Sequence, residues 1–277
     1  MTTTIPSPVT VTAGAATDAG LKRELNEDSY LSSAPLFLVA DGMGGYDAGE
    51  IASATVVEEF ASLAGKPFLD MTTVKSVFER ARSRVAALPD DGGAGAGTTL
   101  SGVAISEHAG SGYWLVVNVG DSRTYRFAGG ALEQISVDHS VVQEMVDQGS
   151  MSADQARVDS RKNVVTRAIG AGAECDADYW MLPAATGDRI LVCSDGLTGE
   201  VSDQRIAEVL AQVESAQEAA QQLVEEAVAS GGRDNITVVV VDAQQVLGVL
   251  SGEDGDGAGL DEDTVPRGDG VGVKGAS

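Results

Sequence analysis

Residues 36–42 read Leu-Phe-Leu-Val-Ala-Asp-Gly, so five apolar residues in a row end in an aspartate and a glycine. Successive side chains of a strand point to opposite faces, and consecutive apolar residues therefore predict a strand that is buried on both faces. Comparable apolar runs occur at Thr99–Ile105, Tyr113–Val119, Arg189–Cys193 and Ile236–Val241. Strands of this kind need a further layer of structure on each side.

Shorter strand runs at Val9–Ala13 and Thr124–Phe127 extend this pattern, and helical stretches lie between the runs. The helical stretches are Gly49–Ala64, Thr72–Ala87, Ser140–Gln148, Ser202–Val209 and Ala216–Ala229. Their expected core-facing residues include Leu63, Phe78, Val85, Leu223 and Val228. The strands come in clusters instead of alternating with helices, which favours antiparallel pairing. The sequence predicts an α+β protein, with a central antiparallel two-sheet arrangement covered by helices.

The composition excludes several classes of function. The 277 residues include 42 Asp and Glu against 18 Lys and Arg, which leaves a formal net charge of −24. Such a surface repels the phosphates of nucleic acids and of anionic membranes. No apolar run approaches the ~20 residues of a membrane span, and residues 1–10 lack the features of a signal peptide. We expect a cytoplasmic protein whose two cysteines, Cys175 and Cys193, are reduced.

A change in composition divides the chain. Residues 243–277 contain nine glycines, seven acids and two bases, with little apolar periodicity. Such a segment buries too little apolar surface to offset the entropy lost on ordering. The sequence therefore predicts one folded domain over residues 1–242 and a disordered acidic tail over residues 243–277.

Acidic residues stand at the ends of the strand runs. The pairs and triplets concerned are Asn26-Glu27-Asp28, Asp41-Gly42, Gly120-Asp121, Asp195-Gly196 and Asp234-Asn235. A single Asp-Gly pair is usually only a turn. Five acids at the tips of strands that share one core can meet, however, and clustered carboxylates suit hard divalent cations. The pattern favours a Mg²⁺ or Mn²⁺ site, with more than one ion.

Paired divalent cations are typical of phosphoryl chemistry, because they hold both the attacking and the leaving oxygen. Arg23, five residues before Asp28, is a candidate for gripping phosphate oxygens with its bidentate fork. The glycine-rich run at 92–97 lacks the lysine of a P-loop and precedes a strand, so we interpret it as the entry to that strand. No Cys-x5-Arg loop follows Cys193, which argues against a thiol phosphatase.

Eight short motifs then occur in a characteristic order. They are Gly20-Leu-Lys-Arg-Glu-Leu-Asn-Glu-Asp28, Val39-Ala-Asp-Gly-Met-Gly-Gly45, Gly97-Thr-Thr99, Val119-Gly-Asp-Ser-Arg123, Asp138-His-Ser140, Thr166-Arg-Ala-Ile-Gly170, Cys193-Ser-Asp-Gly-Leu-Thr198 and Arg233-Asp-Asn-Ile-Thr237. With these motifs the chain resembles the metal-dependent Ser/Thr protein phosphatases of the protein phosphatase 2C (PPM) family, bacterial type. The resemblance covers residues 10–242, nearly all of the expected domain.

The resemblance implies a four-layer αββα fold, in which a central β-sandwich is flanked by helix pairs. It also implies two to three Mn²⁺ or Mg²⁺ ions. Asp41 would bridge two of them and position the water between them, and Gly42 would offer its backbone carbonyl. Asp195 and Asp234 would complete the shell of the first ion.

Further residues acquire roles from the same resemblance. Glu27 or Asp28 would lie near the second ion, through water, and Asp121 would hold a third, weaker ion together with Asp195. Arg23 would bind the substrate phosphate. Residues 140–166 would form a flap beside the active site.

One position departs from the pattern of many eukaryotic members. Met43 stands where those members carry a histidine that is proposed to protonate the leaving group. A thioether cannot donate a proton, so the sequence assigns no general acid. We expect His139 to have a structural role near the flap and His108 to lie on the surface.

The resemblance implies hydrolysis of phosphoserine and phosphothreonine in proteins, by direct attack of a metal-activated water. The expected partners are phosphoproteins, in particular substrates of a bacterial Ser/Thr kinase, and the expected oligomeric state is a monomer. The chain could also be the soluble catalytic part of a longer protein. An alternative hypothesis is a catalytically weak regulator that binds phosphoproteins on the same fold. Loss of a metal ligand would mark such a regulator, but every expected acid is present.

Overall fold

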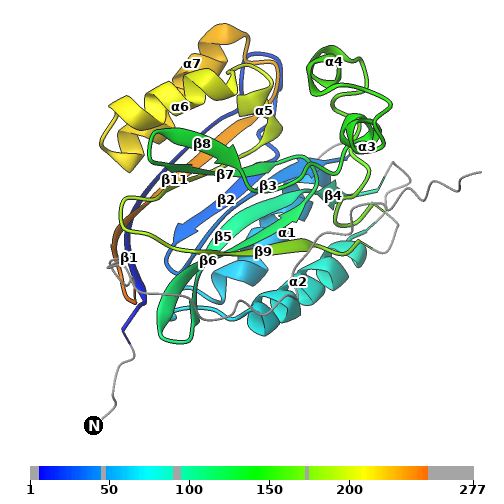
Figure 1. The fold of residues 1–277 in the computed structure, drawn as a ribbon. Helices are drawn as coiled ribbons and strands as arrows, with labels where there is room; N and C mark the ends of the chain where they lie inside the picture. The colour runs from blue at the N-terminus through cyan, green and yellow to red at the C-terminus, as the bar shows by residue number, and fades with distance from the viewer. Residues whose placement is uncertain (1–5, 45–47, 90–94, 172–174, 249–277) are drawn as a thin grey trace, which may run out of the picture.

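Two antiparallel β-sheets lie face to face, and a pair of helices covers the outer face of each, as Figure 1 shows. The computed structural model describes residues 6–44, 48–89, 95–171 and 175–248. This architecture confirms the α+β prediction of a central antiparallel β-sandwich flanked by helix pairs. None of the helices in these described ranges is long and apolar enough to cross a bilayer.

The strands of the first sheet come from both ends of the chain. In spatial order they are β1 (Val9–Asp18), β11 (Ile236–Val246), β10 (Arg189–Cys193), β7 (Arg123–Ala128) and β8 (Ala131–Gln134). The longest pairing joins β1 to β11, from Val9 opposite Val246 to Asp18 opposite Ile236. The N-terminal strand is thus held in place by the last strand of the fold.

The second sheet is built from the middle of the chain. Its order is β2 (Asp28–Ser33), β3 (Leu36–Met43), β5 (Leu100–His108), β6 (Ser111–Val119) and β9 (Asp178–Pro183), and the short β4 (Gly97–Thr98) pairs with the end of β3. Each neighbouring pair is antiparallel. The clustered strand runs of the sequence therefore become neighbours in one sheet.

The helices are divided between the outer faces and one end of the sandwich. They are α1 (Ala48–Ala61) and α2 (Met71–Ala86) on the second sheet, α6 (Asp203–Gln212) and α7 (Ala216–Ser230) on the first, and the shorter α3 (Val141–Asp147), α4 (Ala153–Val158) and α5 (Asp195–Thr198). Serine or aspartate side chains cap several N-termini; for example, Asp70 accepts from the Thr73 amide at 2.6 Å.

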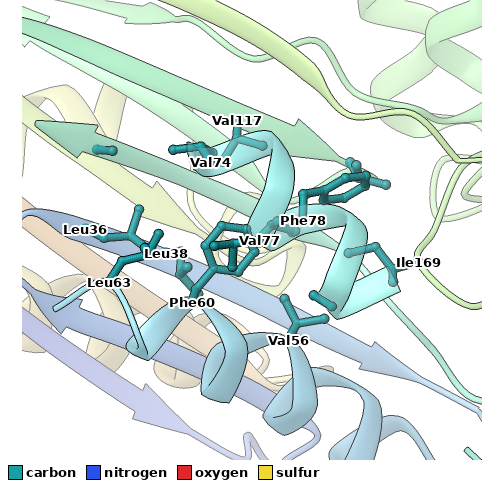
Figure 2. Close-up of a cluster of buried hydrophobic side chains, with 14 of the residues drawn as sticks. Leu36, Leu38, Val56, Phe60, Leu63, Val74, Val77, Phe78, Val117 and Ile169 are labelled. Carbon is teal, nitrogen blue, oxygen red and sulfur yellow. The ribbon is translucent and has the colours of Figure 1, made fainter. Parts of the chain in front are cut away.

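Alternation along β3 separates two of the three apolar layers. Leu36 and Leu38 pack under α1 and α2, whereas Phe37 and Val39 lie between the sheets. Figure 2 shows the layer under the helices, where Phe60 and other residues of α1 and α2 meet Leu36 and Leu38. The five consecutive apolar residues of β3 are thus explained by burial on both faces.

The same alternation occurs in the first sheet. Leu191 and Cys193 of β10 face α6 and α7, whereas Ile190 and Val192 face the other sheet. The expected core residues Leu63, Phe78, Val85 and Leu223 are buried, and Val228 is partly buried against the layer under α6 and α7.

Two features of the fold differ from the sequence-based expectation. The strands β4, β8 and β9 and the helices α4 and α5 were not expected. In addition, β11 continues to Val246, so the expected domain boundary at residue 242 falls inside a strand. Pairing with β1 extends the strand past the last apolar run. The rest of the expected tail, residues 249–277, lies outside the described residues.

Candidate metal and phosphate site

The expected site acids lie at neighbouring strand ends. Asp28 opens β2 and stands directly opposite Asp41 near the end of β3. Asp195 follows β10 as the first residue of α5, and Asp234 lies just before β11. Strands β10 and β11 are antiparallel and Cys193 pairs with Val238, so the end of β10 and the start of β11 lie at the same end of the first sheet. Asp195 and Asp234 therefore lie close to that end. One end of the sandwich thus carries carboxylates from both sheets.

The backbone of Asp41 is held rigidly by the Thr98–Thr99 segment. Its amide donates to Oγ1 of Thr99 at 3.0 Å. Its carbonyl accepts from the Thr99 amide at 2.9 Å and from Oγ1 of Thr98 at 3.0 Å. Threonines that the sequence quoted only as a motif therefore fix the position of the central acid.

Gly42 occupies a place that no larger residue can take. A Cβ there would lie 2.3 Å from the carbonyl oxygen of Gly49 and 2.6 Å from that of Glu27. The Gly42 amide also donates to the Glu27 carbonyl at 3.2 Å. This close approach brings the Glu27–Asp28 segment against the end of β3, as expected for residues that share one site.

Asp28 has one satisfied carboxylate oxygen and one that is not. Oγ of Ser194 donates to Oδ2 of Asp28 at 2.8 Å, whereas Oδ1 is buried and has no hydrogen-bond partner. Removal from water raises the pKa of Asp28 to about 7, and the charges of Asp195 and Asp234 add to this effect. A buried, unpartnered carboxylate oxygen is what a cation site requires.

The other carboxylates are perturbed in the same direction. Removal from water raises the pKa of Asp41 well above its usual range, and the charges of Asp28, Asp195, Asp121 and Asp234 raise it further. Burial, with the charge of Asp195, raises the pKa of Asp121 to about 8. Burial, with the charge of Asp234, raises that of Asp195 to about 6. The acids share one electrostatic field, which a bound cation would relieve.

The donor set fits hard divalent cations, although its shell is not closed. Among the described residues, no three His, Cys, Asp or Glu side chains are gathered tightly enough to hold a metal ion. Asp234 turns its Oδ2 to Nη2 of Arg23, at 2.8 Å. Aspartate oxygens with a backbone carbonyl are the ligands that Mg²⁺ and Mn²⁺ prefer. A complete shell therefore requires these carboxylates to turn toward one another.

Arg23, the expected phosphate-binding cation, is exposed at the same end of the sandwich. Its side chain is 51% exposed even though it is paired with Asp234. The charges of Asp234, Glu27 and Asp41 all act on its guanidinium. The structure thus places Arg23 beside the carboxylates, within reach of a ligand from solvent.

A cavity of about 400 Å³ adjoins the acids Asp121 and Asp195. Its other wall comes from the segment that carries α3 and α4, including Arg157 and Lys162. The two ends of that segment meet at a bridge between Ser140 and Val165. Residues 140–166 thus form a protrusion on a narrow base (Figure 1), and their role as a flap stays a prediction.

Thr99 and Asn235 have clear structural roles at this site that were not assigned from the sequence, whereas His139 was expected to have a structural role near the flap. Thr99 holds Asp41, as described above. Asn235 accepts the Glu27 amide at 2.8 Å and donates to the carbonyls of Ala19 and Leu25. His139 is buried beneath the Gly120–Asp121 turn. All three lie within the quoted motifs, which was the only available signal. The other histidine, His108, is exposed, as expected.

The sequence and the fold match proteins of one family. A sequence model described as protein phosphatase 2C matches residues 22–229. The serine/threonine protein phosphatase PstP of Mycobacterium tuberculosis is 40% identical over 255 residues, which are 87% of this chain and 48% of PstP. The serine/threonine phosphatase stp of Listeria monocytogenes is 33% identical, with 82% of this chain and 93% of stp covered.

A solved structure agrees with these sequence matches. The crystal structure of the PstP catalytic domain in complex with two manganese ions superposes with a TM-score of 0.77 at 38% identity. The match covers 85% of this chain and 99% of that domain. The chain spans about half the length of full-length PstP, namely 48%.

Proposed function

The chain belongs to the protein phosphatase 2C family, and on that premise we propose that it removes phosphate from phosphoserine and phosphothreonine in proteins. One observation carries the proposal: Asp28, Asp41, Asp121 and Asp195 lie buried at one end of the sandwich, where burial and the charges of neighbouring acids raise the pKa of each. The family relatives PstP and stp are serine/threonine phosphatases by name.

We infer that the site holds two Mn²⁺ or Mg²⁺ ions, as the PstP catalytic domain holds two manganese ions. Asp41, the carbonyl of Gly42, Asp195 and Asp234 would be the ligands, with Asp28 and Glu27 reached through water. Asp121 would hold a third ion together with Asp195. Bound divalent cations supply an activated water for in-line attack on phosphorus and neutralise charge on the phosphate oxygens.

The protein's own residues bind and orient the substrate. Arg23 presents its guanidinium to solvent at the edge of the site, and its planar fork can donate to two phosphate oxygens. The cavity beside Asp121 leaves room for the chain that carries the phosphate. Met43 has no proton to donate, so we assign the protonation of the leaving alkoxide to water.

Phosphoproteins are the substrate class that this reaction requires, and a Ser/Thr kinase must produce them. The cytoplasmic location, the monomeric state and the bacterial Ser/Thr kinase as the source of the substrates remain predictions from the sequence. The alternative of a catalytically weak regulator requires a missing ligand, and the ligand set supports the enzyme instead.

Purified protein tests the proposal directly. With Mn²⁺ it should release phosphate from a phosphothreonine peptide, act poorly on a matched phosphotyrosine peptide, and lose turnover in EDTA. Turnover should return when Mn²⁺ is restored. Tight phosphopeptide binding without phosphate release would favour the regulator, and robust turnover in EDTA would exclude the metal mechanism.

A further inference from the structure

His139 is buried at the base of the flap, where three segments of the chain meet. Its backbone amide donates to the Gly120 carbonyl at 2.9 Å, and its carbonyl accepts the Thr166 amide at 2.8 Å. Its ring reaches in two directions, toward Gly120 and toward Asp178 of β9. The side chain is 5% exposed. Such a position ties the flap base to the turn that carries Asp121.

The two ring contacts determine which nitrogen carries the proton. The Gly120 amide donates to Nδ1 at 3.2 Å, so Nδ1 must be unprotonated. Nε2 then carries the hydrogen and donates to Oδ2 of Asp178 at 3.0 Å. Nη1 of Arg167 lies 3.5 Å from Oδ1 of Asp178 and 3.4 Å from Nε2 of His139. A guanidinium can only donate and Nδ1 of the neutral ring already accepts, so the contact of Arg167 with Nε2 is not a hydrogen bond. The contact of Nε2 with Asp178, the outer contact, thus orients the ring, and Nδ1 accepts the Gly120 amide in the inner contact.

Gly120 connects this ring to the carboxylates of the site. Its φ of +100° lies in the region that favours glycine, and a Cβ there would lie 2.6 Å from Cγ2 of Thr99. Thr99 in turn accepts the Asp41 amide. The Gly120 backbone therefore sits between the His139 ring and the residue that fixes Asp41, and the next residue is Asp121.

We propose that His139 is a positioning residue for the metal site. Through Nδ1 it holds the Gly120 amide, and so it sets the placement of Asp121 and of the Thr99–Asp41 contact. The proposal rests on the proposed function, because Asp121 and Asp41 act there as metal ligands. His139 itself touches neither substrate nor metal. Its effect is therefore expected on metal affinity as well as on turnover.

Two substitutions separate the two ring contacts. In His139→Asn the amide oxygen stands near the position of Nδ1 and can still accept the Gly120 amide, while the contact to Asp178 is lost. In His139→Gln the amide reaches the position of Nε2 and can still contact Asp178, while the inner acceptor is lost. The exposed His108 offers the matched control, His108→Asn.

Calorimetric titration with Mn²⁺ alone, without substrate, is the main readout. We expect His139→Gln to weaken the weakest binding step by about 10- to 100-fold, the range typical of residues that orient metal ligands. His139→Asn should stay within about threefold of the wild type, as should His108→Asn. Equal affinities for the Asn and Gln variants, whether both normal or both weakened, would overturn the proposal.

The proton position can be measured without any substitution of His139. The chain contains two histidines, so long-range ¹H–¹⁵N spectra of the Mg²⁺ protein resolve both rings, and His108→Asn assigns them. The His139 ring should carry its proton on Nε2, and a proton on Nδ1 would overturn the proposal even if the variants fail to fold. A wild type that neither binds Mn²⁺ nor releases phosphate would instead contradict the proposed function.

Discussion

Arg23 donates a hydrogen bond from Nη2 to Oδ2 of Asp234 at 2.8 Å, across 211 residues of sequence. The pair joins the expected phosphate-binding cation to an expected metal ligand. A carboxylate has several lone pairs, so Asp234 can bind a metal ion and keep this bond, but a divalent ion would draw charge from the carboxylate and weaken its attraction for Arg23. Metal binding should therefore make the Arg23 guanidinium more available to phosphate, which couples the two binding events at one carboxylate.

Substitution of Arg23 should affect substrate binding more than folding. In Arg23→Ala we expect the KM for a phosphopeptide to rise about tenfold or more, because a bidentate charged contact is lost. Arg23→Lys should recover only part of the loss, since an ammonium lacks the planar fork. The melting temperature should hardly change, because so exposed an ion pair contributes at most about 1 kcal/mol. The neighbouring exposed Lys22→Ala is the control, and an equal rise in its KM would argue against a specific role for Arg23.

Asp41→Asn tests the central carboxylate while its size is preserved. We expect kcat/KM to fall by more than about 100-fold, because even residues that only orient metal ligands are worth 10- to 100-fold. Without metal, the variant should be at least as stable as the wild type, because the substitution removes one of several buried carboxylates that repel one another when they are ionised. Glu133→Gln, on the exposed edge strand β8, removes a charge elsewhere and should leave turnover unchanged. Near-normal turnover in Asp41→Asn would exclude Asp41 as a metal ligand.

The raised pKa values of the site predict how stability depends on pH. Folding raises the pKa of Asp28 to about 7, of Asp121 to about 8 and of Asp195 to about 6, so the folded protein binds protons more tightly than the unfolded chain. The contribution of such groups is fully present below their unfolded pKa and is lost as the pH rises through the folded values. In EDTA, the melting temperature should therefore fall between pH 5 and pH 8, and saturating Mn²⁺ should oppose the fall.

Two variants isolate the cause of this pH dependence. Asp121→Asn should flatten the fall in EDTA, because it removes one of the groups that must ionise. Asp159→Asn should leave the slope unchanged, because its partner Arg161 lowers the pKa of Asp159 to about 2, below this window. A melting temperature that stays level or rises from pH 5 to pH 8 in EDTA would contradict the electrostatic description of the site.

The parts of the fold that were predictable from sequence are those with a continuous apolar signal. The bounds of β10, Arg189–Cys193, agree with the expected run because both faces of the strand are buried. The strand β9 was missed because it lies at a sheet edge, is only half-buried and ends in a proline, so no apolar run marks it. The helix α5 is a single turn, too short for helical periodicity to appear.

The residues of the site can also be divided into those whose placement was predictable from sequence and those whose placement was not. Asp41 lies near the end of β3 and Asp195 follows two residues after the end of β10, so their placement follows once those buried strands are known. The bond from Arg23 to Asp234 and the contact of His139 with Gly120 depend on how distant polar loops pack, and no local pattern encodes them. Asn235 belongs to the same class. Motifs identified these residues as important, but only tertiary structure connects them.

An ion pair far from the site acids should affect the stability of the protein and not its turnover. Arg189 begins β10 at the end opposite Asp195. It bonds Asp242 through Nε at 2.6 Å and donates to the carbonyls of Leu210, Val213 and Glu214 at the end of α6. Arg189→Met would leave a partly buried carboxylate and several carbonyls without this partner, at a cost of up to about 3–5 kcal/mol, or a fall in melting temperature of roughly 10 °C.

The control for this variant is another arginine with carboxylate partners. Arg205 pairs with Glu208 and Glu226 but is 38% exposed, so Arg205→Ala should lower the melting temperature far less than Arg189→Met, because solvent screens exposed ion pairs. Below its melting temperature, Arg189→Met should keep its kcat. Equal melting temperatures for the two variants would show that burial of Arg189 adds nothing.

The C-terminal end of the fold can be located by truncation. The strand β11 pairs with β1 as far as Val246, and Ala243 is buried between the sheets. Removal of residues 249–277, which contain none of the quoted motifs, should leave both kcat and melting temperature unchanged.

Removal of everything after Asp242 also deletes the paired end of β11, including Ala243, whose amide donates to the Asp188 carbonyl at 2.9 Å. The melting temperature of that shorter protein should fall by several degrees, because apolar area and strand hydrogen bonds are lost together. If both truncated proteins have the same melting temperature as the full chain, the end of β11 contributes nothing to the stability of the fold, and residue 242 is the true boundary of the domain.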